Sequence, residues 1–194
     1  MSFVRLFGPS NEFRRRIEDS REMLYRLAYA WCHDAPLADD LAQEVLLRAL
    51  AREAQLRDRE RLKSWLCAIL ANCFKDHHRR RREHQGLDAL EDVEASASAT
   101  PEESAAAAEL TRRVRAEIAR LPLGQRQVLT LVDLEGFSYA EVGEILEVPI
   151  GTVMSRLCRA RQALREPLIG FAPQAEAARI RSSLTNWRSR SPCS

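Results

Sequence analysis

Apolar side chains recur at intervals of three and four residues along most of this chain, and this spacing constrains its fold more than any other feature. The interval is that of one face of an α-helix, whereas a half-buried strand alternates apolar and polar residues. Only seven glycines and eight prolines interrupt the 194 residues. The sequence therefore predicts an all-α protein made of two small helical lobes. A large enzyme is excluded by the length.

The first predicted lobe spans residues 10–84. Its apolar positions from Phe13 to Trp31 predict one long helix, and Pro36 marks the start of a second helix. Apolar residues line one side of that second helix, while its other faces carry Asp39, Asp40, Gln43, Glu44 and Arg48. A third helix begins near Leu62 and changes from apolar to strongly basic at residues 79–82.

An acidic stretch follows at residues 85–111, which hold seven Asp and Glu residues and neither Lys nor Arg. Such a composition is typical of a flexible linker, and a solubilising spacer is its simplest interpretation. The linker leads to a second predicted lobe at 112–166. Residues 167–194 form a C-terminal extension of unknown role, for which we expect a poorly ordered tail.

The second lobe contains the pattern of a helix-turn-helix. Ser138 and Glu141 form a capping box that starts a short helix, with Gly143 small enough for two helices to cross and Val148 filling the turn. The turn lacks the glycine that a left-handed residue favours. Glu147 or its neighbour must therefore adopt that conformation at a cost on the order of 1 kcal/mol.

The last helix of this lobe, from Ile150 to Arg165, is basic on one side and apolar on the other. Val153, Leu157 and Leu164 are expected to face the core, and no acid occurs between Ile150 and Arg165. Its arginines are Arg156, Arg159, Arg161 and Arg165. Four arginines alone are compatible with a solvated basic helix, but the adjoining capping box and turn favour recognition of a DNA major groove.

Arginine makes up 28 of the 30 basic residues, and the formal net charge is only +2. Arginine suits planar, bidentate partners such as phosphate and guanine edges. A GC-rich genome explains the same bias equally well. The bulk charge therefore does not by itself indicate a nucleic-acid partner.

Residues 13–82 and 114–166 resemble the bacterial sigma factors of the extracytoplasmic-function (ECF) type. Residues 39–45, together with Trp65, Leu66, Asn72 and Asp76, resemble the family's region 2, and residues 137–142 and 151–161 resemble its region 4. The resemblance implies a non-enzymatic subunit that binds core RNA polymerase and directs promoter-specific transcription initiation, recognising minus-10 and minus-35 elements. An anti-sigma factor is the expected regulator.

The resemblance also implies three sets of contact residues. Contacts with core polymerase, through the clamp helices of the beta-prime subunit, would be made by Asp39, Asp40, Gln43, Glu44 and Leu47. Minus-10 DNA would be bound by Lys63, Trp65, Asn72, Lys75, Asp76, Arg79 and Arg80. Minus-35 DNA would be bound by Thr152, Met154, Ser155, Arg156, Cys158 and Arg159. The beta flap is a further expected polymerase contact.

The chemistry of the minus-10 set suits that role. Its lysines and arginines can follow phosphates, Asn72 can hydrogen-bond an unstacked base, and Trp65 can stack on a base, although a core position is the more usual one for such a tryptophan. Capturing an extruded base offsets part of the cost of opening the duplex. In the minus-35 set the chain departs from the family at Met154, where a basic residue is common, and at Cys158, where relatives carry larger residues.

Several other classes of function find little support. His77 and His78, with two cysteines nearby, match no four-ligand zinc pattern, so we expect no metal and no cofactor. The odd number of cysteines, five, favours reduced thiols. No apolar run is long enough for membrane insertion and no signal peptide is evident, so a cytoplasmic protein is expected. No nucleophile elbow or phosphate loop suggests an enzyme.

The main alternative is a stand-alone helix-turn-helix regulator that binds operator DNA without polymerase. The first lobe discriminates between the two, because such a regulator has no need of it.

Overall fold

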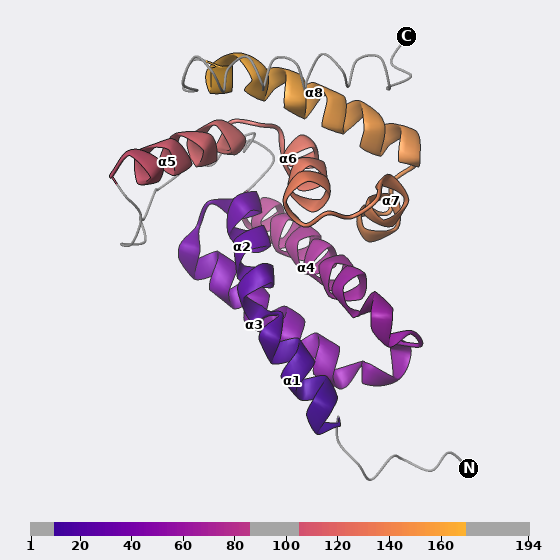
Figure 1. The fold of residues 1–194 in the computed structure, drawn as a ribbon. Coiled ribbons are helices and arrows are strands. Elements are labelled where there is room, and N and C mark those ends of the chain that lie inside the picture. Colours follow the sequence, from indigo (N-terminus) through magenta and orange to yellow (C-terminus); the bar gives the residue numbers. More distant parts are fainter. Residues whose placement is uncertain (1–9, 86–104, 170–194) are drawn as a thin grey trace, which may run out of the picture. The chain divides into compact units, whose positions relative to one another are not determined.

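The computed structural model describes residues 10–85 and 105–169 of the chain. Within these two ranges every regular element is a helix or a helical turn, and no strand occurs. The chain forms two compact units, built mainly on helices α1–α4 and α5–α8 (Figure 1). The all-α prediction is therefore confirmed for the described part of the chain.

The first unit comprises four helices and two short 3-10 turns. They are α1 (Asn11–Asp19), α2 (Arg21–Cys32), α3 (Ala35–Ala51), the turns Glu53–Gln55 and Arg59–Arg61, and α4 (Leu62–Gln85). Helix α3 packs against both α2 and α4, and α1 lies along α2 and α3 (Figure 1). At the centre of this unit the buried rings of Trp31 and Phe74 meet edge to face, with centroids 5.7 Å apart.

The prediction of a single helix from Phe13 to Trp31 is wrong, because the helix is interrupted at Ser20. The Ser20 hydroxyl donates to the carbonyl of Arg16, and its backbone N–H donates to the carbonyl of Ile17, only three residues back. Serine side chains compete in this way with regular helical hydrogen bonds. The expected restart is confirmed: the Asp34 carboxylate accepts from the backbone N–H of Leu37 at 3.0 Å and caps α3.

The second unit comprises α5 (Ala105–Ala119), α6 (Leu123–Leu129), a π-helical turn (Thr130–Leu134), α7 (Tyr139–Leu146) and α8 (Ile150–Ile169). Helices α5 and α6 both pack against α8 (Figure 1). Val153, Leu157 and Leu164 are buried as predicted, and they place one side of α8 in the core from Val153 to Leu164.

The expected linker and extension fall largely outside the described residues. Of the linker at 85–111, residues 86–104 lie outside them, and 105–111 form the first turns of α5. Of the extension at 167–194, residues 167–169 continue α8 and 170–194 lie outside.

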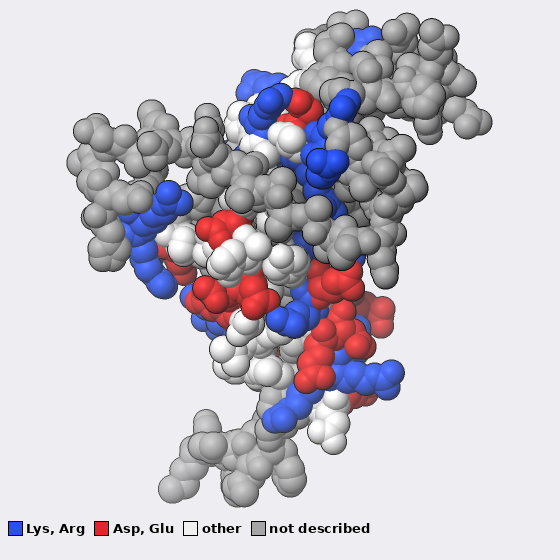
Figure 2. Space-filling view, turned by 90° about the vertical axis from the view of Figure 1, so that its left-hand side faces the viewer, with Lys and Arg blue, Asp and Glu red and all other residues white. Residues whose placement is uncertain are grey.

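Acidic and basic side chains lie next to one another on the face shown in Figure 2, in keeping with the formal charge of +2. Across the two described ranges, no helix combines the length and the apolarity required to span a bilayer.

Candidate nucleic-acid and protein interfaces

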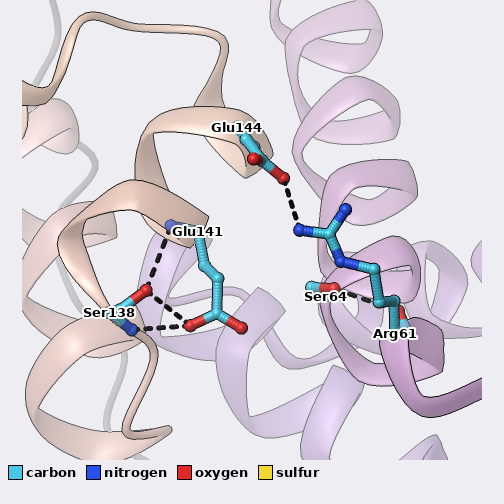
Figure 3. Close-up of polar contacts among 5 residues, drawn as sticks. All are labelled: Arg61, Ser64, Ser138, Glu141 and Glu144. Atoms are coloured by element: carbon cyan, nitrogen blue, oxygen red, sulfur yellow. Dashed lines mark hydrogen bonds and ion pairs between the residues drawn. The ribbon is translucent and has the colours of Figure 1, made fainter.

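The capping box at the start of α7 forms as predicted (Figure 3). The Ser138 hydroxyl accepts from the backbone N–H of Glu141 at 3.3 Å, and the Glu141 carboxylate accepts from the Ser138 backbone N–H at 2.9 Å and from its hydroxyl at 2.7 Å. These bonds satisfy backbone donors that the first turn of a helix otherwise leaves without partners. They fix the residue at which α7 begins.

The turn between α7 and α8 also has the predicted geometry. Glu147 is left-handed, with φ of 56°, and the backbone N–H of Val148 donates to the carbonyl of Gly143 at 3.0 Å. A Cβ atom on Gly143 would lie 3.0 Å from the Val148 carbonyl oxygen. Only glycine lets the turn approach α7 so closely, so this residue and the strained Glu147 together set the path of the chain into α8.

Helix α8 carries the predicted minus-35 residues outside its buried stripe. Ser155, Cys158 and Arg159 lie opposite the stripe, and Thr152, Met154 and Arg156 flank it. Arg159 is exposed, and the remaining five members, Thr152, Met154, Ser155, Arg156 and Cys158, are half-buried. The guanidinium of Arg156 lies against Gly124 in α6, where an added Cβ would come within 3.0 Å of Arg156 Cζ. The Ser155 hydroxyl donates to the Thr152 carbonyl at 3.1 Å, as serine often does within a helix.

Arg161 differs from the other arginines of α8, because its guanidinium is held by the carboxylate of Asp133. Arg161 Nε donates to Asp133 Oδ2 at 3.1 Å, and a second guanidinium nitrogen donates to Oδ1. Hydrogen bonding to Asp133 raises the pKa of Arg161 further above its usual value. This bidentate pair fastens α8 to the π-helical turn, and we assign Arg161 to the stability of the unit.

In the first unit, the predicted polymerase-binding residues occupy the outer side of α3. Leu47 exposes 68% of its surface, and Asp40 and Gln43 are also exposed. Asp39 is held at 2.8 Å by Arg21 of α2 and at 2.6 Å by the Gln43 amide. The outer side of α3 therefore presents one apolar side chain, Leu47, among carboxylates and an amide.

The predicted minus-10 residues lie on α4. Asn72, Lys75 and Arg79 are exposed at spacings of three and four, so they share one side of the helix. Trp65 is half-buried and lies seven residues before Asn72, on the same side. Lys63 and Arg80 are exposed as well, but their positions along the helix place them away from the centre of this side.

Asp76 differs from the rest of the minus-10 set because arginines occupy its carboxylate. Arg79 donates to Asp76 Oδ1 at 3.3 Å, and Arg48 of α3 lies 3.6 Å from Oδ2. Arg48 also holds Glu44 at 2.5 Å.

The histidines and cysteines near the basic end of α4 have packing partners. The ring of His78 lies 4.6 Å from that of Phe74, and no group of three potential metal ligands occurs in the part of the chain that the structure describes. None of the four described cysteines, Cys32, Cys67, Cys73 and Cys158, forms a disulfide. Burial raises the pKa of Cys73 to about 11, partly opposed by the charge of Arg48.

Three residues that bear on these surfaces were not singled out from the sequence: Arg21, Arg48 and Asp133. The four-residue spacing of Glu44 and Arg48 is a signal that could have identified that pair. The contacts of Arg21 and Asp133 join different helices, and no local pattern indicates them.

Comparison with known protein families matches both units. Residues 17–84 match the family described as Sigma-70 region 2, and residues 111–164 match the family described as Sigma-70, region 4. The first match covers the helices that carry the α3 and α4 surfaces. The second covers the helix-turn-helix.

Individual relatives agree with the family matches. The chain is 33% identical over 175 residues to the RNA polymerase sigma-H factor of Pseudomonas aeruginosa, covering 83% of this chain and 88% of that protein. It is 29% identical over 172 residues to the ECF RNA polymerase sigma factor SigW of Bacillus subtilis, covering 83% and 91%.

Among solved structures, the sigma factor RpoE of Bartonella quintana, crystallised in complex with the anti-sigma factor NepR, superimposes with a TM-score of 0.66. The two sequences are 25% identical, and the match covers 82% of this chain and 98% of RpoE. With two sigma-70 regions in order along the chain and relatives similar over most of their length, this protein belongs to the sigma-70 family, as a sigma factor of the ECF group.

Proposed function

We propose that this sigma factor divides its work between two units, with the first binding core RNA polymerase and the minus-10 strand and the second binding the minus-35 duplex. Sigma factors are non-enzymatic initiation factors, so the chemistry of RNA synthesis belongs to polymerase. In this proposal Asp40, Gln43, Glu44 and Leu47 of α3 face the clamp helices of the beta-prime subunit, and Asp39 braces them through Gln43. The second unit contacts the beta flap, and the assembly acts in the cytoplasm.

The observation that carries this proposal is the separation of two surfaces of different chemistry on adjacent helices. Helix α3 presents carboxylates, an amide and the exposed Leu47, which suit a protein partner. Helix α4 presents Asn72, Lys75 and Arg79, which suit phosphates and an unstacked base. A stand-alone regulator has no use for the first of these surfaces.

For the second unit, α8 offers Arg156 and Arg159 three residues apart, outside its buried stripe. Arginine at such positions can donate two hydrogen bonds to a guanine edge, while Thr152 and Ser155 suit phosphates or base edges, and Met154 can touch a thymine methyl group. Cys158, on the same exposed side, leaves room for a base pair where relatives carry larger residues.

The decisive test is run-off transcription with purified core polymerase. Core with this protein should initiate at a promoter that neither opens alone. Tight DNA binding without polymerase, together with no transcript, would refute the proposal.

Paired variants separate the two units. Arg156→Ala with Arg159→Ala should lower promoter use and leave core affinity unchanged, whereas Gln43→Ala with Glu44→Ala should lower core affinity. If the arginine variant also loses core affinity, its residues are wrongly assigned.

Control by an anti-sigma factor is part of the same proposal. The RpoE structure contains the anti-sigma factor NepR, and this chain matches RpoE over both units. An anti-sigma factor of this chain should compete with core polymerase for it. Pull-down of the tagged chain from its own bacterium, with and without added core, tests this expectation: a partner protein that added core does not displace would contradict it.

A further inference from the structure

Arg48 links the helix assigned to polymerase with the helix assigned to DNA. It lies near the end of α3, and its guanidinium reaches two carboxylates on different helices. One nitrogen is 2.5 Å from Glu44 Oε1 on α3, and another is 3.6 Å from Asp76 Oδ2 on α4. The Arg48 side chain is only 25% exposed, so water screens this contact less than it screens an ordinary surface ion pair.

Asp76 continues the connection along α4. Its second carboxylate oxygen, Oδ1, accepts from Arg79 at 3.3 Å. Each oxygen of Asp76 thus faces a different arginine, one from the neighbouring helix and one from the next turn of its own helix. The resulting chain of charges runs from Glu44 through Arg48 and Asp76 to Arg79.

This chain of charges lies at the edge of the apolar core. Cys73 on α4 is buried beside Arg48, and burial raises the pKa of its thiol to about 11, with the arginine charge opposing the shift. Charged groups held against such a surface have fewer conformations available than fully solvated ones. Their geometry is therefore more closely set by the packing of α3 on α4.

Phosphates repel a carboxylate, so Asp76 could contact DNA only by accepting from a base amino group. Both oxygens of Asp76 already face arginines, whereas Arg79 is exposed and carries the charge that a phosphate needs. We propose that Arg48 and Asp76 are positioning residues, and that Asp76 contributes to minus-10 binding by holding Arg79 and α4 in place without touching DNA. This inference rests on the proposed function, and it replaces a direct DNA contact by Asp76.

The test is a double-mutant cycle in the full chain bound to core polymerase. Wild type, Arg48→Ala, Asp76→Ala and the double variant are compared for binding to a template with a single-stranded minus-10 element. Each single change should weaken binding. Because the two residues act through one contact, the double variant should bind on the order of fivefold more tightly than it would if the two single losses multiplied. Losses that simply multiply would overturn the proposal, because a direct Asp76 contact would not depend on Arg48.

Salt dependence gives a readout that a purely structural role would not move. If Arg79 loses its orientation in Asp76→Ala, the plot of log affinity against log salt should become shallower by about 0.7, the contribution of one phosphate contact to single-stranded DNA. An unchanged slope would contradict the proposal. Arg79→Ala should change the slope by the same amount, and a variant that carries both Arg79→Ala and Asp76→Ala should show no further change in slope.

Matched controls separate these effects from loss of folding. Glu22→Ala with Arg26→Ala removes an exposed ion pair of α2 and should leave DNA binding unchanged. Arg48→Lys and Asp76→Asn keep most of the side-chain volume, and each should show a smaller loss than its alanine counterpart. If the wild type fails to initiate transcription, the proposed function is refuted. If the wild type is active but the two single losses of affinity multiply, only this inference is refuted.

Discussion

Gly143 lies against the turn that follows α7, and alanine in its place measures how tightly the helix-turn-helix is packed. A Cβ atom there would lie 3.0 Å from the Val148 carbonyl oxygen and 4.0 Å from Val153 Cγ2. Val148 cannot move away freely, because its own N–H donates to the Gly143 carbonyl at 3.0 Å. The clash therefore falls on backbone that is already bonded to the substituted residue.

The expected magnitude follows from two opposing terms. Alanine in a helix is favoured over glycine by about 1 kcal/mol. Forcing a group into packed structure costs about 1–3 kcal/mol, so Gly143→Ala should destabilise the second unit by about 1 kcal/mol net. Gly151, in the first turn of α8, has nothing within 4 Å of an added Cβ. Gly151→Ala should therefore stabilise the same unit by about 0.4–1 kcal/mol.

Hydrogen exchange measured by mass spectrometry on peptides from α7 and α8 is the appropriate assay. A chain with two units need not unfold in one transition, so the assay must resolve individual helices. Relative to wild type, Gly143→Ala should exchange about fivefold faster and Gly151→Ala more slowly. Slower exchange in both variants would refute the steric account, because only the helix-propensity term would then remain.

Three further predictions concern caps, ion pairs and thiols. Ser138→Ala should cost about 1 kcal/mol by removing the α7 cap, detected as faster exchange in α7 but not in α4. Arg161→Met should destabilise the second unit by about 1–3 kcal/mol, because Asp133 loses its bidentate partner, and should speed hydrogen exchange in α8. The preferred minus-35 sequences should stay the same; a changed preference would show that Arg161 contacts DNA. With its pKa raised to about 11, only about one Cys73 thiol in a thousand is ionised at pH 8, so iodoacetamide should modify it only after unfolding.

Local sequence rules predicted the helix-turn-helix in detail. The capping box at Ser138 and Glu141, the close approach at Gly143 and the left-handed Glu147 all depend on residues within one or two turns of each other. Short-range geometry of this kind is determined by backbone sterics and by hydrogen bonds between near neighbours. The break at Ser20 also depends on hydrogen bonds between near neighbours. The sequence prediction missed it because the apolar spacing typical of a helix continues past this serine.

Ion pairs between helices could not be predicted in the same way. Asp133 and Arg161 are 28 residues apart, and their contact requires α8 to pack beside the π-helical turn. The contact of Arg48 with Asp76 likewise requires α3 to pack on α4. The apolar pattern predicts that such helices pack together, but not the rotation and offset that bring two particular side chains into contact.

This difference changes what the abundance of arginine means in this chain. By residue type alone, Arg21, Arg48 and Arg161 cannot be told apart from Arg159, and all of them suit phosphate. In the structure Arg21 holds the carboxylate of Asp39, Arg48 holds those of Glu44 and Asp76, and Arg161 holds that of Asp133. Arg159 is exposed. An arginine that holds a carboxylate must give up that contact, or share its guanidinium between the carboxylate and a phosphate as we propose for Arg79, before it can bind DNA. Substitutions of the first three should therefore lower stability or alter positioning, and substitution of Arg159 should lower DNA affinity and reduce its salt dependence.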